Sequence, residues 1–291
     1  MLNLLKKPLL NNWSLFWLIS VPVSLVMLAA ILRVETWDGP TVSSMIQLSV
    51  RMAIPWLFVA FACSSMPVLF PGPFSLWLMR NRKIFGLAFA AGMSWQGFFI
   101  LWLVTIHSDY YINEVYVLRD AIEGVVGYSF LAAMIVTSFQ PGRKLLSPKG
   151  WKRLHKTGIY FLWAYAFSTY WWAVSYYPDP VPLDYLYYWA GFNAWTLRIA
   201  AWTKKQIKRS GATPAESGSG LVPMALSAGF ALAGLTLAAL GRAWFPVAEP
   251  LLNGYSFTRW PELYLPYWPF EPFLFMLLFM AAAWCLARVR T

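Results

Sequence analysis

The chain has 291 residues, of which 59% are hydrophobic and 12% are charged, whereas soluble domains carry about 25% charged residues. A chain this apolar would expose large apolar patches in water, so its composition excludes an ordinary soluble domain. The formal charge of +11 comes from short basic clusters between apolar runs. That placement is typical of membrane topology signals and argues against nucleic acid as a partner.

Apolar runs of about 20 residues, the length that crosses a bilayer, recur along the chain and predict an all-α integral membrane protein. The first run follows Lys6 and Lys7, but it is longer than the core of a signal peptide and no small-residue cleavage site follows it. We therefore expect about eight transmembrane helices. Their predicted positions are residues 13–34, 50–70, 84–106, 121–140, 157–177, 185–202, 221–243 and 270–287.

Two segments divide the predicted spans. Ser210–Gly220, with the sequence SGATPAESGSG, has the composition of a flexible linker. The aromatic, proline-rich segment 245–270 is expected to lie at the membrane interface. We expect residues 1–209 to form a six-helix bundle, 210–220 to be a cytoplasmic linker, and 221–291 to form a two-helix appendage.

The basic residues predict the orientation of the chain. Most of the 23 lysines and arginines fall on one side of the membrane if the N-terminus is cytoplasmic, and Glu216 is the only acidic residue on that side. By the positive-inside rule, both termini are then cytoplasmic. Because the sequence has no organellar targeting signal, we expect it in a bacterial inner (cytoplasmic) membrane.

Two segments at predicted cytoplasmic helix ends resemble a known family. Leu78–Gln96 reads LMRNRKIFGLAFAAGMSWQ, a basic flank followed by a helix that begins Phe-Gly-Leu-Ala. Thr137–Trp172 contains Trp-Lys-Arg-Leu-His at the start of a helix. Both resemble the ferric-reductase-like transmembrane family, and within it the haem-binding membrane subunit of periplasmic methionine sulfoxide reductase systems (MsrQ type). The resemblance covers roughly residues 50–205, and it implies a six-helix ferric-reductase-like core.

The resemblance also implies where a b-type haem would be held. Family histidines on two facing helices correspond here to Gln96 and to Ser168 or Thr169, and a further one falls near Arg82. Only His155 matches a family histidine. The chain thus resembles a haem-carrying bundle in which other residues stand at most of the haem-ligand positions.

Other side chains near these positions can also ligate haem iron. They are Met93 on the first helix and Tyr165 or Tyr170 on the second. The two histidines of the chain cannot share one haem. His107 follows the end of one predicted span and His155 precedes the start of another on the opposite side of the membrane, so they lie roughly 30 Å apart. We therefore expect no bound cofactor, with a b-type haem or a quinone as the alternatives.

Gln96 lies at about the middle of a predicted span. A polar residue at that depth usually forms a hydrogen bond to a neighbouring helix. We expect packing to be its main role, with Ser94, Ser168 and Thr169 as candidate partners.

Two charged segments are candidate contact surfaces. The cluster Lys149, Lys152, Arg153 and Lys156 surrounds His155, disfavours its protonation, and could bind anionic lipids or an acidic partner. On the opposite side, residues 107–123 form a charged segment that we expect to be solvated and that could receive a periplasmic partner.

Three functions fit these observations. The first is a non-catalytic membrane subunit or assembly protein of a larger complex, derived from a ferric-reductase-like fold that lost its haem ligands. The second is an electron-transfer protein that holds haem or quinone with unusual ligands. The third is a transporter or lipid-handling protein. No nucleotide-binding, nucleophile-elbow or zinc-protease motif is found, which disfavours an enzyme.

Overall fold

The computed structural model describes residues 2–175, 177, 179–209, 221–240, 243 and 274–288, and every regular element among them is helical. Four described helices are long and apolar enough to cross a membrane: α2 (Asn12–Ile31), α3 (Gly39–Ala62), α6 (Arg82–Ile106) and α12 (Leu221–Ala239). The remaining long helices are α8 (Leu118–Val136), α10 (Pro148–Ser175), α11 (Pro182–Arg209) and α14 (Leu274–Arg288). The short ones are α1 (Leu2–Leu5), η1 (Pro8–Leu10), α4 (Met66–Leu69), α5 (Pro73–Arg80), α7 (Ser108–Tyr110), η2 (Tyr111–Val115) and α9 (Gln140–Arg143).

The chain divides into two compact units. The first unit combines Met1–Cys63 with Leu76–Ala166, and the second combines Ser64–Ser75 with Phe167–Thr291. The predicted linker 210–220 and the whole predicted interfacial segment 245–270 lie outside the described residues. The expected domain bounds therefore stay a prediction.

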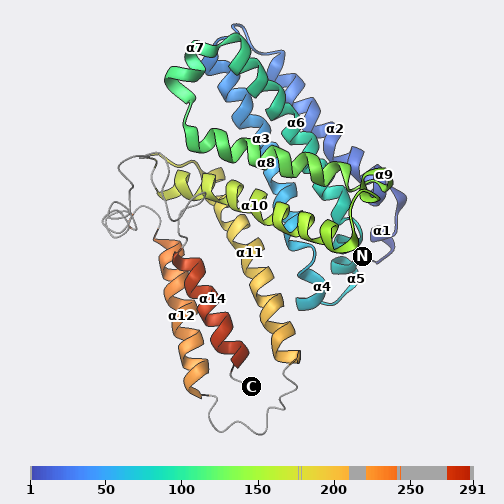
Figure 1. Ribbon diagram of the computed structural model, residues 1–291, viewed down its shortest axis with the longest axis vertical. Helices are drawn as coiled ribbons and strands as arrows, with labels where there is room; N and C mark the ends of the chain where they lie inside the picture. Colours follow the sequence, from blue (N-terminus) through green and yellow to red (C-terminus); the bar gives the residue numbers. More distant parts are fainter. Residues whose placement is uncertain are drawn as a thin grey trace. The chain divides into compact units, whose positions relative to one another are not determined.

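In the first unit, α2, α3 and α6 run side by side while α8 crosses them (Figure 1). One cluster of buried side chains joins the three helices near the start of α6, including Ile19, Cys63 and Phe85. A second joins them near the end of α6, around Met27 and Phe99. Helix α8 carries three charged residues in its first turns, which explains why it is not among the four apolar helices.

The beginnings of α2 and α6 are tied together by hydrogen bonds. The buried Asn81 accepts from the Asn12 backbone N–H at 3.1 Å and donates to the Asn11 side-chain oxygen at 3.2 Å. The indole of Trp77 donates to the Leu10 carbonyl at 2.8 Å. Since both helices start at the same end, the basic flanks at Lys6 and Arg80 lie at one end of the first unit.

Helix α3 begins earlier than the sequence analysis predicts. The side chain of Asp38 accepts from the Thr41 backbone N–H at 2.8 Å, a typical N-terminal cap, and Pro40 occupies the first turn. The helix ends at Ala62, so the predicted span 50–70 is displaced toward the C-terminus. Hydropathy misses the first turns because they are rich in serine and threonine.

In the second unit, the last two helices pack on each other and on α11. The Tyr188 hydroxyl donates to the Ala238 carbonyl at 2.7 Å, and Ser227 donates to the Ala282 carbonyl at 2.9 Å. Edge-to-face contacts of Phe192 with Phe275 and Phe279 fill the space between α11 and α14. Helices α12 and α14 therefore pack on each other and on α11.

Candidate functional site

The largest cavity described in the first unit lies between α3, α6, α8 and α10 and has a volume of about 720 Å³. We call it the Gln96 cavity. Apolar side chains make up most of its wall, and a few polar groups interrupt them. The polar lining residues are Ser43, Gln47, Gln96, Tyr111, Asp120, Tyr128, Ser129 and Tyr165.

A hydrogen bond between two lining residues orients Gln96. The hydroxyl of Tyr128 on α8 lies 2.9 Å from the Gln96 side-chain oxygen and 3.0 Å from the Met93 carbonyl oxygen. The Tyr128 hydroxyl has one proton for these two acceptor oxygens, so the hydrogen bond to Gln96 is a shared one, and the amide nitrogen of Gln96 carries two N–H donors. The O and N of the amide are assigned from this hydrogen bond.

Three of the residues predicted to hold a cofactor, Met93, Gln96 and Tyr165, are brought together here. Met93 is buried and lines the Gln96 cavity beside Gln96, and Tyr165 lines the same cavity from α10. Tyr170 and Ser168 are buried in the second unit, and Thr169 there is exposed. A role in cofactor binding stays a prediction for all of these residues.

The partner of Gln96 is one that the sequence analysis did not name. Ser94 is exposed and donates to the Ala90 carbonyl within α6, so it does not serve Gln96. Tyr128, like Gln96, is a polar residue within a predicted span, and such groups need a partner on a neighbouring helix. That requirement identifies each of the two residues as one that needs a partner, but it does not pair them with each other.

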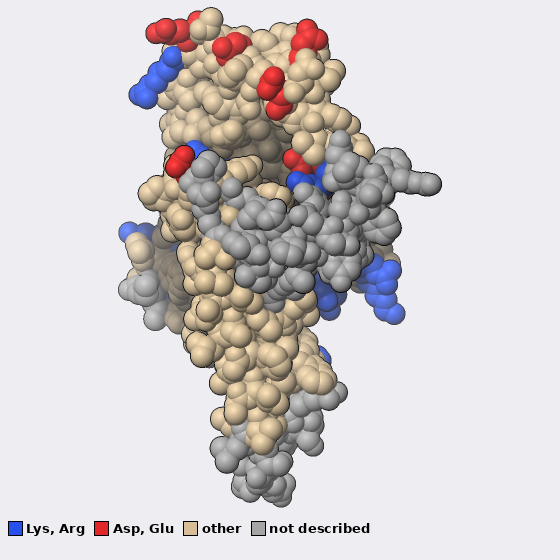
Figure 2. Space-filling model, turned by 90° about the vertical axis from the view of Figure 1, so that its left-hand side faces the viewer, with Lys and Arg blue, Asp and Glu red and all other residues tan. Residues whose placement is uncertain are grey.

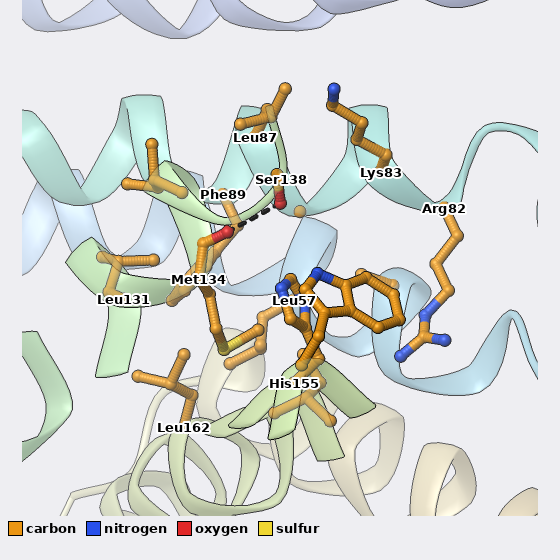
Figure 3. A pocket seen from close by; sticks show the side chains of 15 residues that line it. Leu57, Arg82, Lys83, Leu87, Phe89, Leu131, Met134, Ser138, His155 and Leu162 are labelled. Carbon is orange, nitrogen blue, oxygen red and sulfur yellow. Dashed lines mark hydrogen bonds between the residues drawn. The ribbon is translucent and has the colours of Figure 1, made fainter. Parts of the chain in front are cut away.

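A second, smaller cavity of about 180 Å³ surrounds His155 (Figure 3). We call it the His155 cavity. It is lined by Arg82 and Lys83 at the start of α6, by the end of α8 and by the first turns of α10. Leu131 and Leu162 line both cavities and separate them.

The His155 ring is fixed by two neighbours. Its Nε2 lies 3.0 Å from the Thr137 hydroxyl oxygen, and the centre of its ring lies 4.3 Å from the centre of the Trp151 ring. The single Thr137 hydroxyl proton is donated to the Ala133 carbonyl at 2.6 Å. The proton between the ring and Thr137 therefore belongs to Nε2, and His155 donates it to Thr137.

Burial lowers the pKa of His155 to about 4, and the charges of Arg82 and Arg143 add to this effect. The ring is consequently neutral near pH 7. Positive neighbours do disfavour protonation, as the sequence predicts, but the charges that act are these two arginines. The predicted cluster Lys149, Lys152, Arg153 and Lys156 is exposed in the first turns of α10.

These residues do not fit a b-type haem held between histidines. The described lining of the Gln96 cavity contains neither histidine nor cysteine, and His155 lines the other, smaller cavity of about 180 Å³. His155 shares its cavity with Arg82, the first residue of α6, whereas His107 follows the last. A helix of that length separates them by roughly 37 Å. Among the described residues, no group of three potential metal ligands gathers.

One carboxylate at the edge of the predicted outer segment is buried. Glu123 on α8 is 4% exposed, and its Oε1 accepts no hydrogen bond within the described part of the chain. The Nε atom of Arg119 lies 3.9 Å from this oxygen. The expectation of a solvated segment is therefore wrong at Glu123, while Asp109 and Glu114 are exposed.

No protein-family model matches the chain, and comparisons with curated proteins and with solved structures also find no match. The fold itself defines a class: over its described residues, this is an all-helical protein whose apolar helices suit a lipid bilayer. The resemblance to ferric-reductase-like proteins stays a prediction.

Proposed function

We propose that this chain is an integral membrane protein that binds a lipophilic molecule with a carbonyl-bearing ring, of the quinone class, in the Gln96 cavity. The observation that carries the proposal is the Tyr128–Gln96 hydrogen bond in the wall of a cavity of about 720 Å³. The hydrogen bond leaves amide N–H donors for a carbonyl oxygen of the ligand.

The size and chemistry of the cavity support this ligand class. Sites for small organic molecules occupy about 300–1,000 Å³ and combine an apolar wall with a few fixed polar groups. Tyr165 and Tyr111 supply aromatic rings to the wall, and such rings pack favourably on a flat conjugated ring. The His155 cavity, at about 180 Å³, is too small for such a ligand.

The membrane, the number of spans and the orientation in this proposal are those predicted from the sequence. We place the protein in a bacterial inner membrane, with about eight spans and both termini cytoplasmic. Binding a quinone corresponds to the second function predicted from the sequence, an electron-transfer protein that holds haem or quinone with unusual ligands, and not to the first, a non-catalytic subunit without a cofactor.

Quinone binding by the purified full-length protein in detergent tests the proposal. Quenching of tryptophan fluorescence by a short-chain ubiquinone or by menadione gives the affinity. Gln96→Leu should weaken binding about fivefold, the effect of losing one hydrogen bond of about 1 kcal/mol. Gly124→Leu should weaken it further, because a Cβ at this lining glycine meets no atom within 4 Å and the added side chain occupies the cavity. Unchanged affinity in both variants would contradict the proposal.

An absorption spectrum tests the alternative cofactor. A b-type α band at stoichiometric haem after reduction with dithionite would show that the donor set accommodates haem. That result would replace quinone binding as the function of the first unit. A colourless protein that retains quinone through purification is the expected result.

A further inference from the structure

One carboxyl group of the first unit lies inside the protein. Glu123 on α8 is 4% exposed, and its Oε1 accepts no hydrogen bond within the described residues. Acidic side chains gather at the surface at the top of Figure 2, and the other carboxylates of the described first unit are all exposed. These are Glu35, Asp38, Asp109, Glu114 and Asp120. Because burying an ionisable group in a membrane protein is costly, the position of Glu123 indicates a function.

Helices α8 and α10 pack antiparallel in the first unit. A Cβ at Gly127 of α8 would lie 3.7 Å from the Phe161 ring, and a Cβ at Gly158 of α10 would lie 3.2 Å from the Phe130 ring. The contacts thus move toward the start of α10 as they move toward the end of α8. The residues one turn before Gly127 consequently face the residues one turn after Phe161.

This register places Glu123 beside Tyr165, at the wall of the Gln96 cavity. Each of the two residues lies one turn from the facing pair just described, and the charge of Glu123 acts on Tyr165. Tyr165 lines the cavity, and so do Asp120 and Gly124, which precede and follow Glu123 along α8. The carboxyl group of Glu123 therefore lies directly behind the lining of the cavity.

The cation beside Glu123 is hydrogen-bonded to a different carboxylate. Arg119 Nε lies 3.2 Å from Asp120 Oδ1 but 3.9 Å from Glu123 Oε1, which is beyond hydrogen-bonding distance. Arg119 and Asp120 are the charged groups that act on Glu123, and their opposite charges partly cancel. Helices α3 and α6 contribute no titratable residue to the described lining, whose other titratable residues are Tyr111, Tyr128 and Tyr165.

Water in the cavity links Glu123 to the surface. Asp120 lines the cavity while its side chain is 51% exposed, so the cavity opens at the start of α8. An apolar ring bound in the cavity would displace the water beside Glu123, and loss of water disfavours a carboxylate relative to a neutral carboxyl group. A ligand with this effect takes up a proton as it binds, and acid in turn tightens its binding.

We propose that Glu123 is a proton-binding site at the wall of the Gln96 cavity, and that filling this cavity with an uncharged quinone ring drives proton uptake by Glu123. The proton comes from water at the cavity mouth beside Asp120. An O–H bond forms at the Glu123 carboxylate, and no electron is transferred. The uptake on ligand binding rests on the proposed function, whereas the proton site itself does not.

The affinity for menadione at different pH values tests the linkage, because this quinone does not titrate. The dissociation constant of the full-length protein should rise with pH, by at most about tenfold per pH unit, the limit for one linked proton. Glu123→Gln has the shape of the protonated side chain and should bind at every pH as tightly as the unchanged protein does in acid. Glu114→Gln, at an exposed glutamate, is the matched control and should keep the pH dependence. Equal pH dependence in Glu123→Gln and the unchanged protein would overturn the proposal.

Labelling with dicyclohexylcarbodiimide tests the proton site without a substitution or a ligand. The oxygen of a protonated carboxyl group bonds to the central carbon of this apolar reagent, and the proton moves to a nitrogen. Mass spectrometry of peptides should find the label at Glu123, in an amount that falls as the pH rises. Labelling of Glu123 that is independent of pH, or labelling confined to exposed carboxylates, would contradict the proton site. Labelling at Glu123 in a protein that binds no menadione would support the proton site and contradict the proposed function, so the two can fail separately.

Discussion

The bond between Tyr128 and Gln96 predicts a measurable coupling between α6 and α8. Tyr128→Phe removes the hydroxyl that reaches both Gln96 and the Met93 carbonyl. In a double-mutant cycle with Gln96→Leu, we expect a coupling free energy of about 0.6–1.7 kcal/mol, the range for hydrogen bonds between membrane helices. Unfolding by a denaturing detergent measures it. The exposed Tyr116, changed to Phe, should show no coupling to Gln96→Leu, and equal coupling for both tyrosines would contradict the assignment.

The lowered pKa of His155 predicts a loss of stability in acid. The unperturbed value is 6.5 and burial lowers it to about 4, so between these pH values the unfolded chain binds a proton that the folded protein excludes. The free energy of unfolding should therefore fall as the pH drops from 6.5 toward 4, by at most about 3 kcal/mol. Above pH 6.5 the free energy of unfolding should keep its full value.

Thermal unfolding across this pH range, with His155→Gln as the comparison, measures the effect. Glutamine keeps an N–H donor for Thr137 but does not titrate. The pH dependence should be shallower in the variant. Identical slopes in the two proteins would mean that other groups cause the acid sensitivity.

At the scale of the helix, the close approach of α3 and α6 depends on a glycine. A Cβ at Gly92 would lie 2.6 Å from the Cβ of Ala53 and 3.1 Å from its Cα. Gly92→Ala should therefore destabilise the first unit by about 1–3 kcal/mol. Gly86→Ala, on the same helix with open space around it, should instead stabilise by up to about 1 kcal/mol. Equal stability of the two variants, by detergent titration, would show that the helices can separate at no cost.

The sequence predicts most long helices but not how they are used. Hydropathy finds α2 and α6 within a few residues, because their apolar runs are continuous. It misplaces α3, whose start depends on the cap at Asp38 and not on apolar residues. The Tyr128–Gln96 pair and the position of Arg82 beside His155 depend on how α8 and α10 pack against α6, and that packing leaves no periodic pattern in the sequence.

At the scale of the whole molecule, the basic and acidic segments predict a testable topology. In a chain with Cys63 and Cys285 changed to alanine, Asp109→Cys should react with a membrane-impermeant maleimide added to intact spheroplasts. Lys152→Cys should react only after lysis, because the positive-inside rule places it in the cytoplasm. Gel shifts measure both reactions. The reverse pattern would invert the predicted orientation, and reaction of both cysteines from outside would change the number of spans.

The wall shared by the two cavities has an energetic consequence. Leu131 and Leu162 are buried between the cavities, so a ligand that changes the rotamer of either leucine alters the space on both sides. Occupancy of one cavity would then change the affinity of the other, and thermodynamic linkage would require the factor to be the same in both directions.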